Sequence, residues 1–100
     1  MSESKTSPSE AQSGDALPQI DFVTFILSLA TSALIQMGEH EDGTAGGPVN
    51  LPLAKQTIDM VGMLREKTRG NLDPDETHII ESALYKLRMR YLELKPTGTI

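Results

Sequence analysis

The sequence of 100 residues contains no cysteine and no tryptophan, and only two phenylalanines and two tyrosines. Without cysteine the chain forms no disulfide and offers no thiolate ligand to a metal. So few aromatic side chains argue against a surface on which nucleic-acid bases stack. A formal net charge of -5 also argues against a phosphate-binding face, so we expect no nucleic-acid partner.

Charge is missing from one long segment of the chain. No charged residue lies between Asp21 and Glu39, and the run between them reads FVTFILSLATSALIQMG. The part from Phe22 to Met37 would span about 24 Å as a helix, whereas a membrane span needs about 20 residues. No Lys/Arg cluster flanks the run. We therefore expect the segment to be buried in the core, against a second copy of the chain, or against a partner or membrane surface.

Signals for chemistry are missing as well. The N-terminus has no basic stretch followed by an apolar stretch, so we expect no signal peptide. His40 lies between acidic residues whose spacing fits no standard cation loop, and we interpret this run as a solvated acidic loop. His78 is not at metal-ligand spacing from His40, and no serine has recognisable His and Asp partners. We expect no catalytic residue, no metal site and no cofactor, and hence no enzyme.

Composition divides the chain into a tail and one domain. Residues 1–19 are rich in Ser, Glu and Pro and carry almost no large apolar side chain, so we expect a disordered acidic tail. Residues 20–95 are expected to form a single helical domain, and residues 96–100 a flexible C-terminus. About eighty ordered residues are close to the lower limit for a stable single core, and oligomerisation is a common remedy at this size.

The first helix is predicted over about 21–37. Asp21 is a favourable N-cap, and Gly38 is a natural stop because glycine adopts the left-handed conformation at helix ends. The Gly-rich segment from Glu39 to Asn50 is predicted as a loop, and no strand candidate is longer than four residues.

The second and third helices are predicted over about 51–69 and 74–94. Asn50 can cap the second helix, and Asp73 starts the third with Glu76 three residues later, as in a capping box. The short turn between the two helices predicts an antiparallel hairpin. The predicted fold class is therefore all-α: a three-helix bundle in which the first helix packs into the groove of this hairpin.

Helical periodicity predicts which side chains are buried. The first helix has one broad apolar face, the second has an apolar face opposite one that contains Gly62, and the third has apolar residues at spacings of three and four. The predicted core consists of Phe22, Phe25, Ile26, Leu29, Ala33, Ile58, Val61, Leu64, Ile80, Leu84, Leu87 and Tyr91.

The first helix also has a line of mostly small, hydroxylated side chains. These residues lie at heptad spacing and carry no charge, whereas a surface helix normally presents Lys and Glu to water. Burying four or five large side chains of such a helix would contribute about 6–15 kcal/mol, against association costs of about 4–15 kcal/mol. We interpret the line as a candidate self-association seam: Thr24, Ser28, Thr31 and Ile35.

These features favour a non-catalytic function, as a small oligomerising or protein-interaction module. The expected partner is a second copy of the chain, with a dimer favoured, or another protein. The alternative is a peripheral membrane or membrane-complex accessory protein that inserts its charge-free helix shallowly, although the missing basic face disfavours membrane contact. A small-ligand binder or enzyme is least favoured, because the apolar helix offers only hydroxyls and Gln36 for a buried polar cluster.

Three blocks of the sequence carry a family resemblance. They read FVTFILSLATSALIQMGE, NLPLAKQTIDMVGMLREKTRGNLDPDE and LYKLRMRYLE, and together they cover about Phe22 to Glu93. The chain resembles a bacterial family described as domain of unknown function 1844. The resemblance implies a small helical protein of the bacterial cytoplasm, and it brings no activity and no functional residues with it.

Overall fold

The computed structural model of the chain describes residues 19–96. The predicted tail over 1–19 lies outside the described residues except for its last residue, as do residues 97–100. The elements in chain order are α1 (Phe22–Gln36), β2 (Met37–Glu39), β3 (Ala45–Val49), α2 (Leu51–Lys67) and α3 (Pro74–Leu94). The fold is mostly helical with a small two-stranded sheet, so the prediction of an all-α fold is correct for the helices and wrong for the strands.

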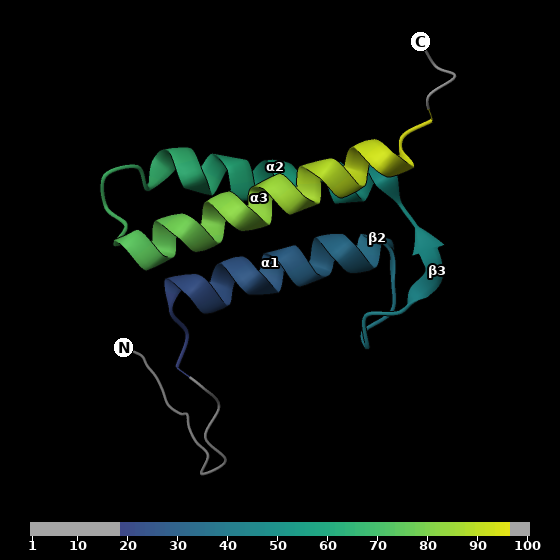
Figure 1. Cartoon of the computed structure of the whole chain (residues 1–100), viewed down its shortest axis with the longest axis horizontal. Coiled ribbons are helices and arrows are strands. Elements are labelled where there is room, and N and C mark those ends of the chain that lie inside the picture. The colour runs from purple at the N-terminus through teal and green to yellow at the C-terminus, as the bar shows by residue number, and fades with distance from the viewer. Residues whose placement is uncertain (1–18, 97–100) are drawn as a thin grey trace, which may run out of the picture.

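The three helices pack side by side around one shared core (Figure 1). α2 and α3 form an antiparallel hairpin, α1 packs against both of them, and the two strands lie at the end away from the α2–α3 turn. The buried apolar side chains come from all three helices and from the residue after α1. They are Ile26, Ala33, Met37, Ala54, Ile58, Val61, Ile80, Leu84 and Leu87, each at most 5% exposed.

Capping side chains explain where the helices begin. The carboxylate of Asp21 accepts a hydrogen bond from a backbone N–H in the first turn of α1, at 2.8 Å, and Asn50 does the same for α2 at 3.1 Å. At the start of α3, Asp73 accepts from the Glu76 N–H at 2.8 Å, and the Glu76 carboxylate accepts from the Asp73 N–H at 2.9 Å. These contacts satisfy N–H groups that have no partner within a helix.

The segment predicted as a loop from Glu39 to Asn50 instead contains part of an antiparallel hairpin. β2 pairs with β3 so that Met37 lies opposite Val49 and Glu39 lies opposite Ala45, with an irregularity between the two pairs. α1 ends one residue before the predicted boundary, because Met37 already belongs to β2. The hairpin returns the chain to the start of α2 beside the end of α1.

The conformation of Gly38, one close backbone contact and the hydrogen bonds of the turn allow a Gly-rich segment to form this hairpin. Gly38 has a φ of +103°, as predicted for the residue that stops α1, and a Cβ on Gly47 would lie only 3.2 Å from the Gly38 carbonyl oxygen. In the turn, the Asp42 carboxylate accepts hydrogen bonds from the N–H and the hydroxyl of Thr44, at 2.9 and 2.7 Å. These hydrogen bonds lower the pKa of Asp42. Turn geometry thus compensates for the low strand propensity of glycine and proline.

Candidate functional site

The outward side of α1 is the clearest candidate site. We call the four predicted seam residues the α1 outer face: Thr24, Ser28, Thr31 and Ile35. The first three are exposed and the last is half-buried. Successive helical residues are 100° apart, so this line lies opposite the fully buried side chains of Ile26 and Ala33. The α1 outer face therefore points away from α2 and α3.

Two large apolar side chains border the α1 outer face. Phe25 is 41% exposed and Leu27 is 47% exposed. The prediction that Phe25 belongs to the core is wrong, because Phe25 lies 100° around the helix from Ile26, at the edge of the side that the other helices cover. Its exposure adds apolar area to a surface that already lacks charge.

The other predicted core residues lie inside the core or at its edge. Seven of them are at most 5% exposed: Ile26, Ala33, Ile58, Val61, Ile80, Leu84 and Leu87. Four more are half-buried and packed against these: Phe22, Leu29, Leu64 and Tyr91. Gly62 is predicted on the face of α2 opposite the core and is instead buried, because the side chains of Arg88 and Leu84 from α3 lie over it.

The Ser28 hydroxyl of the α1 outer face already has a partner within the helix. The Ser28 hydroxyl donates a hydrogen bond to the Thr24 carbonyl oxygen at 2.9 Å, and the Thr24 N–H donates to Asp21 at 2.8 Å. A polar group that enters an interface without a partner is costly, whereas one that is already hydrogen-bonded is not. Covering Ser28 with an apolar surface therefore leaves no unpaired donor.

Shallow hollows extend the α1 outer face toward α3. One hollow of about 410 Å³ lies over Thr24, Leu27, Ser28 and Thr31. A second hollow, of about 310 Å³, lies between α1 and α3 and includes Leu34, Ser82, Ala83 and Lys86. Leu27 and Thr31 line both hollows, so the two form one continuous surface.

Comparison with known proteins identifies the family to which this fold and surface belong. The family model described as domain of unknown function (DUF1844) matches residues 19–93. The chain belongs to the DUF1844 family. No curated protein and no solved structure matches the sequence or fold of this chain. Membership of the DUF1844 family brings no activity with it, so a function has to be inferred from the surface of the domain.

Sequence reasoning missed a second apolar surface of this DUF1844 domain. Tyr85, Met89 and Leu92 on α3 are 66%, 43% and 57% exposed. Their spacing of i, i+4 and i+7 places them on one side of the helix. This spacing is visible in the sequence, but it is shorter than the apolar repeat formed by the core residues on the same helix.

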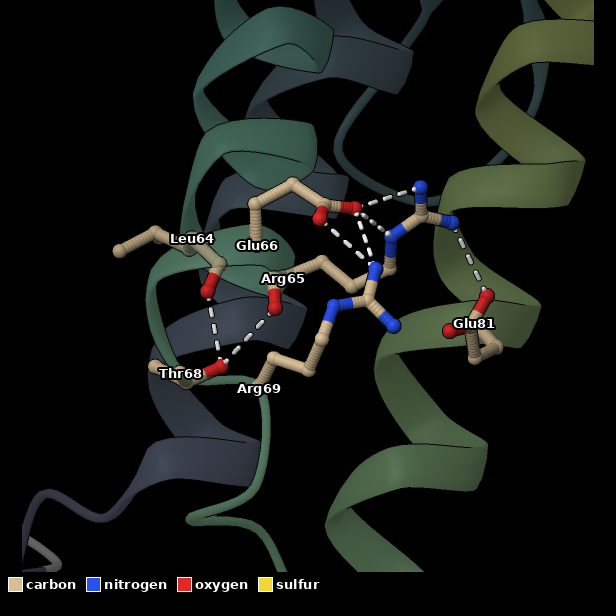
Figure 2. A network of polar contacts seen from close by, with 6 residues as sticks. All are labelled: Leu64, Arg65, Glu66, Thr68, Arg69 and Glu81. Carbon is tan, nitrogen blue, oxygen red and sulfur yellow. Dashed lines mark hydrogen bonds and ion pairs between the residues drawn. The ribbon is translucent and has the colours of Figure 1, made fainter.

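A network of charged side chains joins the end of α2 to α3 in the DUF1844 domain (Figure 2). The Glu66 carboxylate lies 2.7 Å from the Arg69 guanidinium and 3.0 Å from that of Arg65, which also pairs with Glu81 of α3 at 3.1 Å. Hydrogen bonds from Arg69 and Arg65 lower the pKa of Glu66. Hydrogen bonds to Glu66 and Glu81 raise the pKa of Arg65. Every charge in the network has a partner, so we interpret it as a structural contact between the helices.

Residues 19–96 contain neither a metal-binding cluster nor a helix that could span a membrane. No group of three His, Cys, Asp or Glu side chains in this part of the chain is arranged to hold a metal ion. None of its three helices combines the length and the apolar character needed to cross a membrane. The α1 outer face therefore remains the main candidate for function.

Proposed function

We propose that this DUF1844 protein is a non-catalytic module that self-associates through the α1 outer face, with a homodimer as the simplest assembly. The observation that carries the proposal is an exposed helix face without charge. No charged residue occurs from Phe22 to Gly38, while Thr24, Ser28 and Thr31 are exposed. Water-facing helices normally carry charged residues on that side, so this face has the character of a surface covered by another apolar surface.

The chemistry of the face supports a second copy of the same chain as its partner. In a two-fold dimer the same patch serves both copies, so it must be complementary to itself. A patch without charge brings no like charges together, and the short side chain of Ser28 lets two helices approach closely. Burial would also remove Phe25 and Leu27 from water, at about 25 cal/mol for each Å² of apolar area.

The required interface area favours participation of the hollow between α1 and α3. A stable interface buries about 800 Å² on each partner. The 15 residues of α1 extend only about 22 Å, so one face of this helix is too small to supply that area. We therefore include Leu34 and the α3 residues Ser82 and Ala83 in the proposed contact. Lys86, which also lines this hollow, is exposed and is placed at the rim of the contact, where its charge stays in water.

Light scattering over a hundredfold range of protein concentration tests the proposal. We expect a stable dimer for the unmodified chain. Ser28→Lys should dissociate it, because the substitution places a charge in the middle of the α1 outer face, and the variant should remain helical by circular dichroism. The matched control is Gln56→Lys, which adds the same charge at an exposed position of α2. It should leave the mass unchanged.

Several outcomes would contradict self-association through this face. A monomer at every concentration, or a dimer that survives Ser28→Lys, would exclude it. Flotation with liposomes separates the alternative in which α1 enters a membrane surface: a self-associating soluble module stays at the bottom of the gradient. We disfavour the membrane alternative because an interfacial helix usually has a basic face, whereas Asp21 and Glu39 flank α1.

A further inference from the structure

A small pocket between α2 and α3 is separate from the proposed self-association surface. It has a volume of about 240 Å³ and is lined by Lys55, Ile58 and Asp59 of α2 and by Arg88, Tyr91 and Leu92 of α3. None of these residues belongs to the α1 outer face or to the hollow between α1 and α3. The volume is just below the roughly 300 Å³ at which small-molecule sites usually begin. The pocket therefore suits a ligand of fragment size.

The Arg88 guanidinium lies next to a buried glycine of α2. Gly62 is buried in α2, and a Cβ placed on it would lie 3.1 Å from an Nη atom of Arg88. The guanidinium of Arg88 thus packs directly against the backbone of α2, one turn after Ile58. Glycine is unfavourable within a helix. Its presence here makes room for the guanidinium next to the pocket.

Only some of the polar side chains around the pocket have a hydrogen-bond or ion-pair partner within residues 19–96. Asp59 forms an ion pair with Lys55 at 2.8 Å. The Arg88 guanidinium and the Tyr91 hydroxyl form no hydrogen bond or ion pair within residues 19–96. The two cations and one anion leave a formal charge of +1 around the pocket. Because Arg88 is exposed, a ligand would replace water on its guanidinium, and the net charge of the pocket matches a single negative charge.

We propose that this pocket binds a small monocarboxylate with an apolar tail. The carboxylate accepts hydrogen bonds from the Arg88 guanidinium, whose planar donors match the two carboxylate oxygens, and the Tyr91 hydroxyl supplies a third donor. The tail lies against Ile58 and Leu92. A monoanion neutralises the formal charge, and the apolar tail covers the apolar part of the lining. Lys55 remains paired with Asp59 at the rim.

Titration with octanoate, followed by backbone amide NMR, tests this proposal. We expect saturable shifts at Ile58, Asp59, Tyr91 and Leu92, with a Kd on the order of 1 mM for a ligand of this size. Octan-1-ol is the matched neutral probe. It should bind more weakly because it has a single hydroxyl oxygen without negative charge, whereas octanoate offers two charged oxygens to the Arg88 guanidinium. Equal binding of the acid and the alcohol would overturn the proposed carboxylate contact.

Variants at the cationic end of the pocket make the test specific. Arg88→Gln should weaken octanoate binding at least tenfold, because it removes the charge-assisted hydrogen bonds to both carboxylate oxygens. Arg90→Gln is the control, since Arg90 pairs with Glu93 and does not line the pocket. Gly62→Ala should weaken binding less than Arg88→Gln, because the exposed Arg88 guanidinium need move only by a few tenths of an ångström to accommodate the new methyl group. Unchanged affinity in Arg88→Gln, or shifts that map to α1, would exclude the site.

The pocket proposal and the self-association proposal fail independently. Ser28→Lys changes α1 and leaves all six pocket residues in place, so this variant should bind octanoate as the unmodified chain does. Loss of octanoate binding in folded Ser28→Lys would show that the ligand occupies the α1 surface and would overturn the pocket assignment.

Discussion

Replacement of Thr57 with valine is expected to destabilise the fold by about 1–2 kcal/mol. Thr57 is 5% exposed, and its hydroxyl donates to the Gln36 side-chain oxygen at 2.8 Å, with the Leu53 carbonyl oxygen 3.2 Å away. Valine keeps the shape of threonine but removes the hydroxyl. The Gln36 oxygen then loses its partner, at a cost of about 1–3 kcal/mol for a buried group. Because Gln36 is only half-buried, water can reach it, and the lower part of this range applies.

This loss would be a large part of the total stability. Domains gain about 0.05–0.15 kcal/mol for each residue, so residues 19–96 should be stable by about 4–12 kcal/mol. The melting temperature should fall by about 4–8 °C for each kcal/mol lost. Urea unfolding followed by circular dichroism measures the change, at one protein concentration because self-association would add to the stability. Thr57→Ser is the control that keeps the hydroxyl.

A double-mutant cycle shows whether the hydrogen bond itself causes the loss. Gln36→Leu combined with Thr57→Val replaces both polar partners by apolar groups, so the pair should lose less than the two single losses together. The expected coupling energy is about 0.5–1.5 kcal/mol. Losses that add to within about 0.3 kcal/mol would refute the idea that this hydrogen bond couples α1 to α2.

Three further predictions concern the hairpin, the core and the response to acid. Gly38→Ala should cost more than Gly43→Ala in urea unfolding: both residues have positive φ, at about 1–3 kcal/mol of strain, but only at Gly38 would the new methyl group meet a side chain, at 3.0 Å. Leu84→Ala should cost about 2–5 kcal/mol by the same measurement, because this side chain is 1% exposed, and a loss below about 1 kcal/mol would contradict its place in the core. Hydrogen bonds lower the pKa of Asp21 and of Glu66 below their ordinary values of 3.8 and 4.5, so both groups stabilise the fold above these values and lose that contribution as the pH falls through the lowered pKa. Thermal melts from pH 6 to pH 2 should therefore show decreasing stability below about pH 5, with a smaller decrease in Asp21→Asn and Glu66→Gln; an unchanged decrease in both variants would contradict the assignment.

The ends of the helices were predictable because their signals are local. A cap such as Asp73 needs only its own side chain and the next turn of backbone, so the sequence contains all the information. The predicted span of about 74–94 matches α3. At the end of α2 the prediction extends two residues too far, because the chain leaves the helix before Gly70, in a turn that begins at Thr68.

The hairpin was not predictable in the same way. β3 contains Gly46, Gly47 and Pro48, residue types that rarely favour a strand. Its pairing depends on contacts between segments on either side of the turn, including the close approach of Gly47 to Gly38. The residue types of this segment show that it contains glycine and proline, which disfavour helix and strand. They do not show that β2 supplies the hydrogen-bond partners of its backbone.

The hydrophobic pattern of the sequence also does not predict which residues lie at the centre of the buried side of α1. Apolar residues surround most of this helix, so its periodicity defines a broad arc and no sharp centre. The positions of α2 and α3 select Ile26 and Ala33 as the buried line and leave Phe25 at the edge. On α2 a glycine carries no apolar side chain to indicate its burial, so helical periodicity predicts the wrong side of the helix for Gly62.

The two proposed surfaces follow from the same geometry. Three helices around one core leave each helix with an outward side, and the residues there differ sharply in charge. α1 presents Thr24, Ser28 and Thr31 without charge, whereas the α2–α3 pocket presents Arg88 and Lys55. A ligand changes an association equilibrium only if it binds the two assembly states with different affinity. Because the surfaces share no residue, self-association through α1 would leave a pocket accessible on each copy, and monocarboxylate binding would leave the dimer equilibrium unchanged.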